Sequence, residues 1–166
     1  KYLRRLENYL RKNGLNRDPL IMQSLGGVLP FSEACGRGVS ALMSGPAGGV
    51  VGSNYLAKLL GYKNVITTDM GGTSFDVGVI IDNAPLLAPS AYSPRSGPHI
   101  VRYSLLLPMI DITSIGSGGG SVVSIEDGEV KIGPRSAGSR PGPACYNRGG
   151  IEATVTDADL ALGYIS

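Results

Sequence analysis

The sequence has no tryptophan and contains only two cysteines, one histidine and two phenylalanines among its 166 residues. Cys35 and Cys145 lie far apart and form no C-x-x-C arrangement, which excludes a disulfide framework or a zinc ribbon within the chain. His99 alone cannot supply a multi-histidine metal site, and a surface or packing role is expected for it. This cysteine usage predicts a reduced, cytoplasmic setting.

Strong charge and long apolar runs are also missing. The net charge of +2 is too small to predict a nucleic-acid partner. No apolar stretch approaches the ~18 residues that span a bilayer, so no membrane partner is expected. With 42% hydrophobic and 17% charged residues, the chain can bury a core, and one mixed α/β unit is the simplest prediction.

Several common motifs are absent, including G-x-x-x-x-G-K-[ST], G-x-S-x-G, H-E-x-x-H and the EF-hand loop. The segment "GSGGGS" at 116–121 lacks the last glycine of G-x-G-x-x-G and precedes a predicted strand, which argues against a Rossmann site. The bare backbone of Gly118, Gly119 and Gly120 could still line a phosphate or nucleoside.

Periodicity and turn residues predict the regular elements. A helical stripe runs through "KYLRRLENYLRKNG" at residues 1–14 and can end at Gly14. A short buried strand is predicted in "DPLIMQSLGG" and a glycine loop in "TSIGSGGGS". A second hairpin is predicted to turn at Asp127 and Gly128, and a final short helix has Thr156 as cap candidate.

A longer helix is predicted over "SGPAGGVVGSNYLAKLLG", with Ser44 as N-cap, Gly61 as C-cap and one face formed by Ala47, Val51, Tyr55 and Leu59. Its early glycines, Gly48, Gly49 and Gly52, each cost up to ~1 kcal/mol of helix propensity relative to alanine. Close packing against a strand and a bound ligand at the helix N-terminus explain them equally well.

The segment "TTDMGGTSFDVG" at 67–78 places polar residues between two β-branched stretches. We expect a hairpin over 64–81 whose strands are buried and whose tip carries the acid, glycines and hydroxyls. Glycines let the backbone approach a ligand, and successive N–H groups in a bend can converge on an anion. The tip is therefore a predicted phosphate site.

Six ordered motifs resemble those of the hydantoinase A/5-oxoprolinase family, which includes ketone carboxylase subunits and belongs to the actin-like ATPase superfamily. They are "MQSLGG", "SGPAGGVVGS", "DMGGTSFDV", "PMIDITSIGSGGGSV", "GPRSAGSRPGPACYNRGG" and "TVTDADLALG". The resemblance implies one lobe of an actin-like (ribonuclease H-like) α/β ATPase fold, with a mixed sheet and flanking helices. Residues 1–166 are then expected to form a single partial domain, the second phosphate-binding lobe, with the first lobe outside the chain.

The resemblance also implies a function. Such enzymes use ATP, with Mg²⁺ or another divalent metal, to phosphorylate the oxygen of a cyclic amide such as hydantoin or 5-oxoproline. A hydantoinase B-type subunit or domain is the implied partner. The implied catalytic acids are Asp69 and Asp76, and the metal candidates are Asp69 and Asp111. The implied cofactor-binding residues are Gly71, Gly72, Thr73, Ser74, Gly118, Gly119 and Gly120.

Two departures from the family pattern affect this reading. Thr113 stands where the family often has histidine after the aspartate of "PMIDI", and the family's first Gly-Gly-Thr phosphate motif is absent. We therefore expect the isolated chain to bind ATP weakly and to be inactive. A ketone carboxylase subunit and a noncatalytic actin-like nucleotide-binding module remain open as alternatives.

Overall fold

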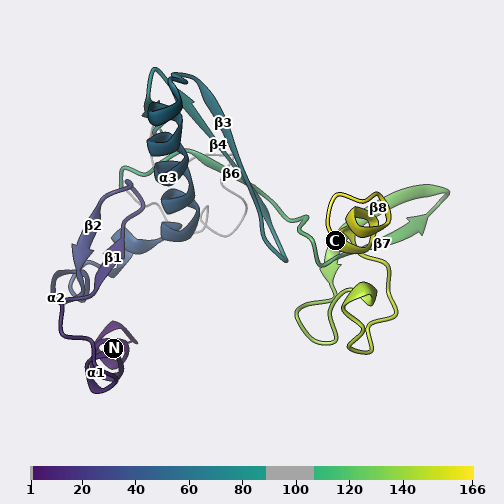
Figure 1. The fold of residues 1–166 in the computed structure, drawn as a ribbon, viewed down its shortest axis with the longest axis horizontal. Helices are drawn as coiled ribbons and strands as arrows, with labels where there is room; N and C mark the ends of the chain where they lie inside the picture. Colours follow the sequence, from purple (N-terminus) through teal and green to yellow (C-terminus); the bar gives the residue numbers. More distant parts are fainter. Residues whose placement is uncertain (1, 89–106) are drawn as a thin grey trace. The chain divides into compact units, whose positions relative to one another are not determined.

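The computed structural model describes residues 2–88 and 107–166, so His99 lies outside the described part. The chain divides into two compact units (Figure 1). Unit 1 draws on Lys1–Thr67 and Val77–Thr113, and unit 2 on Thr68–Asp76 and Ser114–Ser166. Helices and strands occur in both units, as expected for a mixed α/β chain. Among the described residues, no helix is long and apolar enough to span a membrane.

Unit 1 begins with helix α1 (Tyr2–Lys12), which is followed by Gly14 at φ +95°, as predicted. Strand β1 (Leu20–Met22) pairs antiparallel with β2 (Val28–Pro30). The prediction that β1 is buried was wrong, because Leu20 is 58% exposed. Two short helical segments, α2 (Phe31–Ala34) and η1 (Gly38–Ala41), lead to the long helix α3.

Helix α3 (Ser44–Leu60) follows the predicted segment, but only the first half of the predicted face, Ala47 and Val51, lies on the core. Its buried residues are Ala47, Val50, Asn54 and Ala57, whereas Tyr55 and Leu59 are 64% and 66% exposed. Residues four apart drift by about 40° per step around a helix, so a strict spacing of four leaves the core, whereas mixed spacings of three and four remain on it. Its N-cap is Met43, at φ +55°, rather than Ser44, and Gly61 ends the helix as predicted.

The predicted hairpin forms from β3 (Val65–Met70) and β4 (Phe75–Ile81). Strand β4 is central: it pairs with β3, with β5 (Ala84–Pro85) and with β6 (Ile112–Ile115). The predicted burial of the first hairpin strand was wrong, because only Thr67 of β3 is buried. The predicted glycine loop starts later than expected, since residues 113–115 belong to β6.

The core of unit 1 forms where α3 lies against β4 and the segment around β6, and its buried residues are Ala47, Val50, Ile80, Ile110 and Ile112. Gly78 of β4 sits at the closest approach of the helix. A Cβ at Gly78 would lie 2.6 Å from Val50 Cγ2 and 2.8 Å from Thr67 Oγ1. Glycine is therefore required here by packing.

Unit 2 contains the hairpin tip, a second hairpin and a short helix. Strands β7 (Ser121–Glu126) and β8 (Glu129–Ser136) pair antiparallel through the predicted turn, with Asp127 at φ +54° and Gly128 at φ +82°. A short helical turn, η2 (Ala144–Tyr146), precedes helix α4 (Val155–Ala161). Thr154, not Thr156, caps α4, because Thr154 forms a reciprocal capping box with Asp157.

Candidate functional site

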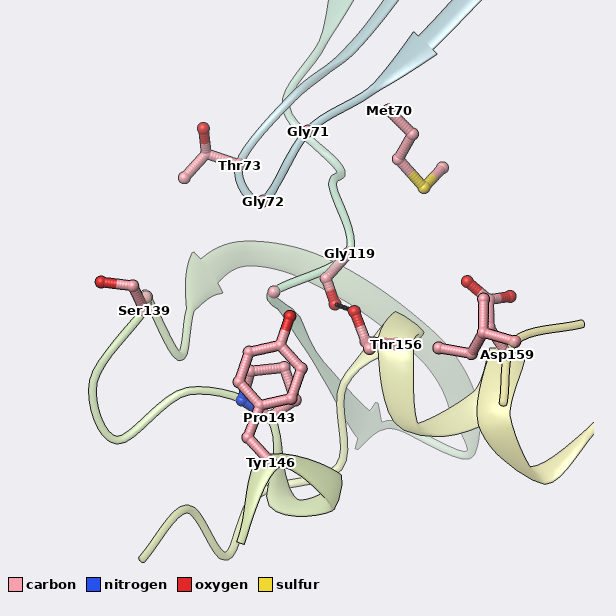
Figure 2. Close-up of a pocket in the computed structure, with 13 residues that line it drawn as sticks. Met70, Gly71, Gly72, Thr73, Gly119, Ser139, Pro143, Tyr146, Thr156 and Asp159 are labelled. Carbon is pink, nitrogen blue, oxygen red and sulfur yellow. Dashed lines mark hydrogen bonds between the residues drawn. The ribbon is translucent and has the colours of Figure 1, made fainter. Parts of the chain in front are cut away.

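A cavity of about 720 Å³ lies within unit 2, at the tip of the β3–β4 hairpin (Figure 2). The hairpin tip, the glycine loop before β7, the segment before α4 and the chain end all contribute to it. Its lining residues are Met70, Gly71, Gly72, Thr73, Gly119, Gly120, Gly138, Ser139, Pro143, Tyr146, Thr156, Asp159 and Ile165. The cavity thus brings together five of the predicted cofactor-binding residues: Gly71, Gly72, Thr73, Gly119 and Gly120.

The turn between β3 and β4 contains backbone N–H groups that have no hydrogen-bond partner among the described residues. The N–H of Gly71 donates to the Ser74 carbonyl at 2.9 Å and closes the turn. The N–H groups of Gly72, Thr73 and Ser74 make no hydrogen bond to another described residue. Gly72 and Thr73 are exposed and line the cavity, so their N–H groups can donate hydrogen bonds to an anionic ligand.

In the glycine loop, by contrast, the N–H groups of Gly118, Gly119 and Gly120 all donate hydrogen bonds. The N–H of Gly118 donates to Ser121 Oγ at 2.9 Å. The N–H groups of Gly119 and Gly120 donate to the carbonyls of Gly71 and Gly72 at 2.9 and 2.8 Å. Gly119 and Gly120 therefore contribute bare backbone surface to the cavity, and Gly118 lies outside its lining.

The predicted acids are not gathered in the cavity. Asp69 is exposed and is not part of the lining, whereas its neighbour Met70 is. Asp76, on β4, accepts a short hydrogen bond from Ser114 Oγ and also lies outside the lining, as does Ser74. Asp111 belongs to unit 1, where its Oδ1 is buried without a partner among the described residues.

Four polar side chains of the cavity were missed as site residues: Ser139, Tyr146, Thr156 and Asp159. All of them lie in the motifs "GPRSAGSRPGPACYNRGG" and "TVTDADLALG", which carried the family resemblance but received no site role. Arg148 stacks over the Tyr146 ring at 5.6 Å from its centroid, which holds a cation beside this wall.

Hydrogen bonds to the Asp157 carboxylate connect η2, which contains Tyr146, to the start of α4. Its carboxylate accepts the Cys145 N–H at 2.7 Å, the Ala144 N–H at 3.3 Å and the Thr154 N–H at 2.8 Å. Desolvation alone would raise the pKa of Asp157, but the hydrogen bonds from Cys145 and Thr154 outweigh it and hold this pKa well below its ordinary value.

The pKa of the neighbouring Cys145 thiol is shifted in the opposite direction. A hydrogen bond to Asp157, with desolvation and the negative charge of Asp157 adding to it, raises the pKa of the Cys145 thiol. A thiol with a raised pKa carries little thiolate at neutral pH and is a poor nucleophile.

The donor set fits a phosphate better than a metal held by protein alone. Free amides at Gly72 and Thr73, together with the Thr73 hydroxyl, match the acceptor oxygens of a phosphate. The described residues contain no group of three or more His, Cys, Asp or Glu side chains placed to bind a metal. Magnesium commonly needs only one or two carboxylates when phosphate oxygens and waters complete its shell, so the exposed Asp69 carboxylate fits that arrangement.

Comparison with known proteins identifies the family. The hydantoinase/oxoprolinase family model matches residues 1–166. The chain is 40% identical to the caprolactamase subunit alpha of Pseudomonas jessenii, with 100% of this chain and 23% of that protein aligned. It is 46% identical to the acetophenone carboxylase gamma subunit of Aromatoleum aromaticum, over 74% of this chain and 16% of that protein.

A solved structure supports the fold. The nucleotide-free structure of acetone carboxylase superposes with a TM-score of 0.75 at 33% identity, covering 99% of this chain and 22% of that one. The predicted actin-like ATPase fold class is therefore confirmed. The chain spans about a quarter or less of the length of the relatives compared here. With a family model that matches it from end to end, this chain belongs to the hydantoinase/oxoprolinase family.

Proposed function

We propose that this chain supplies part of the ATP site of an enzyme that hydrolyses a cyclic amide of the hydantoin or 5-oxoproline type. The observation that carries the proposal is the β3–β4 turn, whose Gly72 and Thr73 line a cavity and whose N–H groups make no hydrogen bond with another described residue. Hydrogen bonds to a charged group contribute about 1.5–3 kcal/mol each, so two or three of them suffice to position a phosphate.

Each predicted residue keeps a defined role in this proposal. The free amides of Gly72 and Thr73 are proposed to hold the terminal phosphates, and Gly71 and Ser74 to close the turn that presents them. Gly119 and Gly120 line the cavity beside them, and Gly118 lies behind the turn. Asp69 and Asp111 are the proposed metal-facing carboxylates. A bound Mg²⁺ would neutralise charge on the phosphate oxygens during transfer. Asp76 is the proposed second acid near the reaction centre, oriented by its hydrogen bond from Ser114.

Phosphorylation answers a chemical difficulty of amide hydrolysis. The amide nitrogen is a poor leaving group, and the carbonyl carbon is a weak electrophile. Transfer of the γ-phosphoryl group to the substrate oxygen, with ADP as the leaving group, would activate the carbonyl carbon for attack by water. The ring C–N bond would then break as the protonated amine leaves, and hydrolysis of the resulting acyl phosphate would release inorganic phosphate. In such transfers, positioning and electrostatic stabilisation by the protein supply most of the catalysis.

The site is proposed to be completed outside this chain. Residues 1–166 form the second phosphate-binding lobe, and another lobe would close over the nucleotide. A hydantoinase B-type subunit or domain is the proposed partner, in line with the names of relatives that are subunits, such as the caprolactamase subunit alpha. A cytoplasmic location stays a prediction.

A ketone carboxylase is the second candidate. The 46% identity to an acetophenone carboxylase subunit and the likeness to the acetone carboxylase structure favour it. Both reactions begin with phosphorylation of a carbonyl oxygen, so the same turn would serve either of them. The acceptor of the phosphoryl group decides between the two.

Phosphate release by the complete protein, with any partner subunit, tests the proposal. ATP hydrolysis is measured with hydantoin, 5-oxoproline and caprolactam, and separately with acetone or acetophenone plus bicarbonate. We expect stimulation by a cyclic amide. Stimulation by a ketone and bicarbonate alone would assign the carboxylase function. Tight ATP binding without stimulation by any of these compounds would indicate a noncatalytic nucleotide-binding module and contradict the proposal.

A further inference from the structure

The turn between β3 and β4, which is proposed to bind phosphate, is held by the glycine loop before β7 through main-chain hydrogen bonds alone. The N–H groups of Gly119 and Gly120 donate to the carbonyls of Gly71 and Gly72 at 2.9 and 2.8 Å. All four residues belong to unit 2, and Gly71, Gly72, Gly119 and Gly120 all line the cavity. Backbone hydrogen bonds therefore join the two loops at the wall of the cavity.

Close contact explains the glycines of this loop. A Cβ at Gly118 would lie 2.6 Å from the Thr73 nitrogen and 2.7 Å from the Gly71 oxygen, and a Cβ at Gly120 would lie 2.8 Å from the Gly72 oxygen. These neighbours are backbone atoms, which cannot swing aside as a flexible side chain can. Neither glycine adopts positive φ, so space, not conformational freedom, is what the loop requires.

The geometry of the peptide unit links these bonds to the free donors. In a planar trans peptide, the carbonyl of one residue and the N–H of the next point in opposite directions. Fixing the Gly71 carbonyl fixes the direction of the Gly72 N–H, and fixing the Gly72 carbonyl fixes that of the Thr73 N–H. The glycine loop thus aims the two unpaired amides away from itself.

Thr156 fastens the glycine loop to helix α4. Its backbone N–H and its hydroxyl both donate to the Gly119 carbonyl, at 2.9 and 2.8 Å (Figure 2). Thr156 is the second residue of α4, whose start is fixed by the Thr154–Asp157 capping box. A well-anchored helix end therefore supports the loop.

We propose that Gly118, Gly119 and Gly120 form a main-chain clamp that aims the phosphate-binding amides, and that Thr156 is a positioning residue acting through Gly119. The inference rests on the proposed function for its ligand, a nucleotide phosphate. The geometry of the clamp itself does not depend on that ligand.

The test compares Gly118→Ala with Gly116→Ala in the complete protein. Both substitutions add one methyl group in the same loop, but a Cβ at Gly116 would meet no described atom within 4 Å. Affinity for Mg-ATP is measured by calorimetry, and amide hydrogen exchange is followed at Gly119 and Gly120. We expect Gly118→Ala to weaken Mg-ATP binding by about tenfold or more, because at least one charged hydrogen bond is lost, and to speed exchange at both amides. Gly116→Ala should change neither.

A second pair keeps the loop sequence intact in case Gly118→Ala does not fold. Thr156→Val removes the hydroxyl at nearly constant volume, and Thr156→Ser retains it. We expect Thr156→Val to raise the KM for ATP about two- to tenfold at nearly unchanged kcat, and Thr156→Ser to restore it.

The outcomes separate the clamp from the proposed function. Faster exchange in Gly118→Ala or Thr156→Val with unchanged Mg-ATP affinity would overturn the positioning role, and so would unchanged exchange in both variants. If the unsubstituted protein binds no nucleotide, the proposed function fails. The clamp is then decided by hydrogen exchange alone: protection of Gly119 and Gly120 that is lost in Thr156→Val and kept in Thr156→Ser supports it.

Discussion

Asp69 is the residue whose proposed role depends most on what binds at the turn. It is exposed and precedes Gly71 by two positions, and its side chain makes no hydrogen bond or ion pair with the rest of the described chain. A carboxylate without a structural partner contributes little to folding. Its substitution should therefore affect chemistry far more than stability.

We predict that Asp69→Asn lowers substrate-stimulated ATP hydrolysis by about a hundredfold or more, as loss of a group that stabilises transition-state charge commonly does. Phosphate release at saturating ATP is the measurement, with the thermal midpoint as the check on folding. Asp127→Asn is the matched control, because it makes the same isosteric change in the β7–β8 turn, where asparagine tolerates positive φ. Activity within a few fold of the original would rule out the metal role of Asp69.

Asp157 makes a prediction of the opposite kind, on stability and pH. Its pKa is lowered in the folded state, so its stabilising effect is complete above the unfolded value near ~3.9 and is lost as the pH falls further. We expect α4 and η2 to loosen below about pH 4, as followed by hydrogen exchange at Cys145.

Asp157→Asn should expose the same amide already at neutral pH and flatten the pH dependence of exchange. Asp159→Asn serves as the control, since the Asp159 side chain makes no hydrogen bond with the described residues. An unchanged acid limb in Asp157→Asn would contradict the assigned role of this carboxylate.

At the scale of elements, sequence patterns predicted the turns better than the buried faces. The β3–β4 and β7–β8 hairpins, and the ends of α1 and α3 at Gly14 and Gly61, follow from local backbone preferences and form as expected. Local backbone preferences did not correctly predict the whole buried face of α3 or the N-cap of α4. Val50 and Asn54 are selected by what lies against the helix, and Thr154 is selected over Thr156 by its bonds with Asp157.

The candidate site divides along similar lines. Gly71, Gly72 and Thr73 were predicted from a motif whose chemistry is local to one turn, and they do line the cavity. The sequence could not predict that the N–H groups of Gly119 and Gly120 donate to carbonyls of the β3–β4 turn. These hydrogen bonds join two segments that lie far apart in the chain. Tyr146 and Asp159 were missed for the same reason.

Contact between α3 and β4 gives a prediction for Gly78. Gly78→Ala should destabilise unit 1 by about 1–3 kcal/mol, because the new methyl group overlaps Val50 and Thr67. Chemical denaturation followed by circular dichroism measures the change. Gly52→Ala in α3 is the control: its Cβ would meet nothing within 4 Å, and alanine raises helix propensity by up to ~1 kcal/mol. Equal stability of the two variants would exclude a packing requirement at Gly78.

Two of the early glycines of α3 have room for a side-chain methyl group. A Cβ at Gly48 would make only ordinary contact with Met22, 3.7 Å away, and one at Gly52 would meet no described atom within 4 Å. Close packing among the described residues therefore does not account for Gly48 or Gly52.

At the scale of the whole molecule, the isolated chain is predicted to be a weak nucleotide binder. It spans 22% of the acetone carboxylase chain that it resembles, and we propose that a second lobe is needed to enclose ATP. Calorimetry on residues 1–166 should give an affinity for Mg-ATP weaker than micromolar, with negligible turnover. Micromolar binding with steady hydrolysis would show that one lobe suffices.

The clamp on the phosphate turn has one further consequence. Its hydrogen bonds join neutral amides to neutral carbonyls, so neither acid nor added salt removes a charge from them. By contrast, the backbone next to Tyr146 is held by a hydrogen bond to the ionised carboxylate of Asp157. On acidification the aromatic side of the cavity should therefore loosen first, and the clamp should be affected only through Thr156, which ties it to the helix end that Asp157 caps.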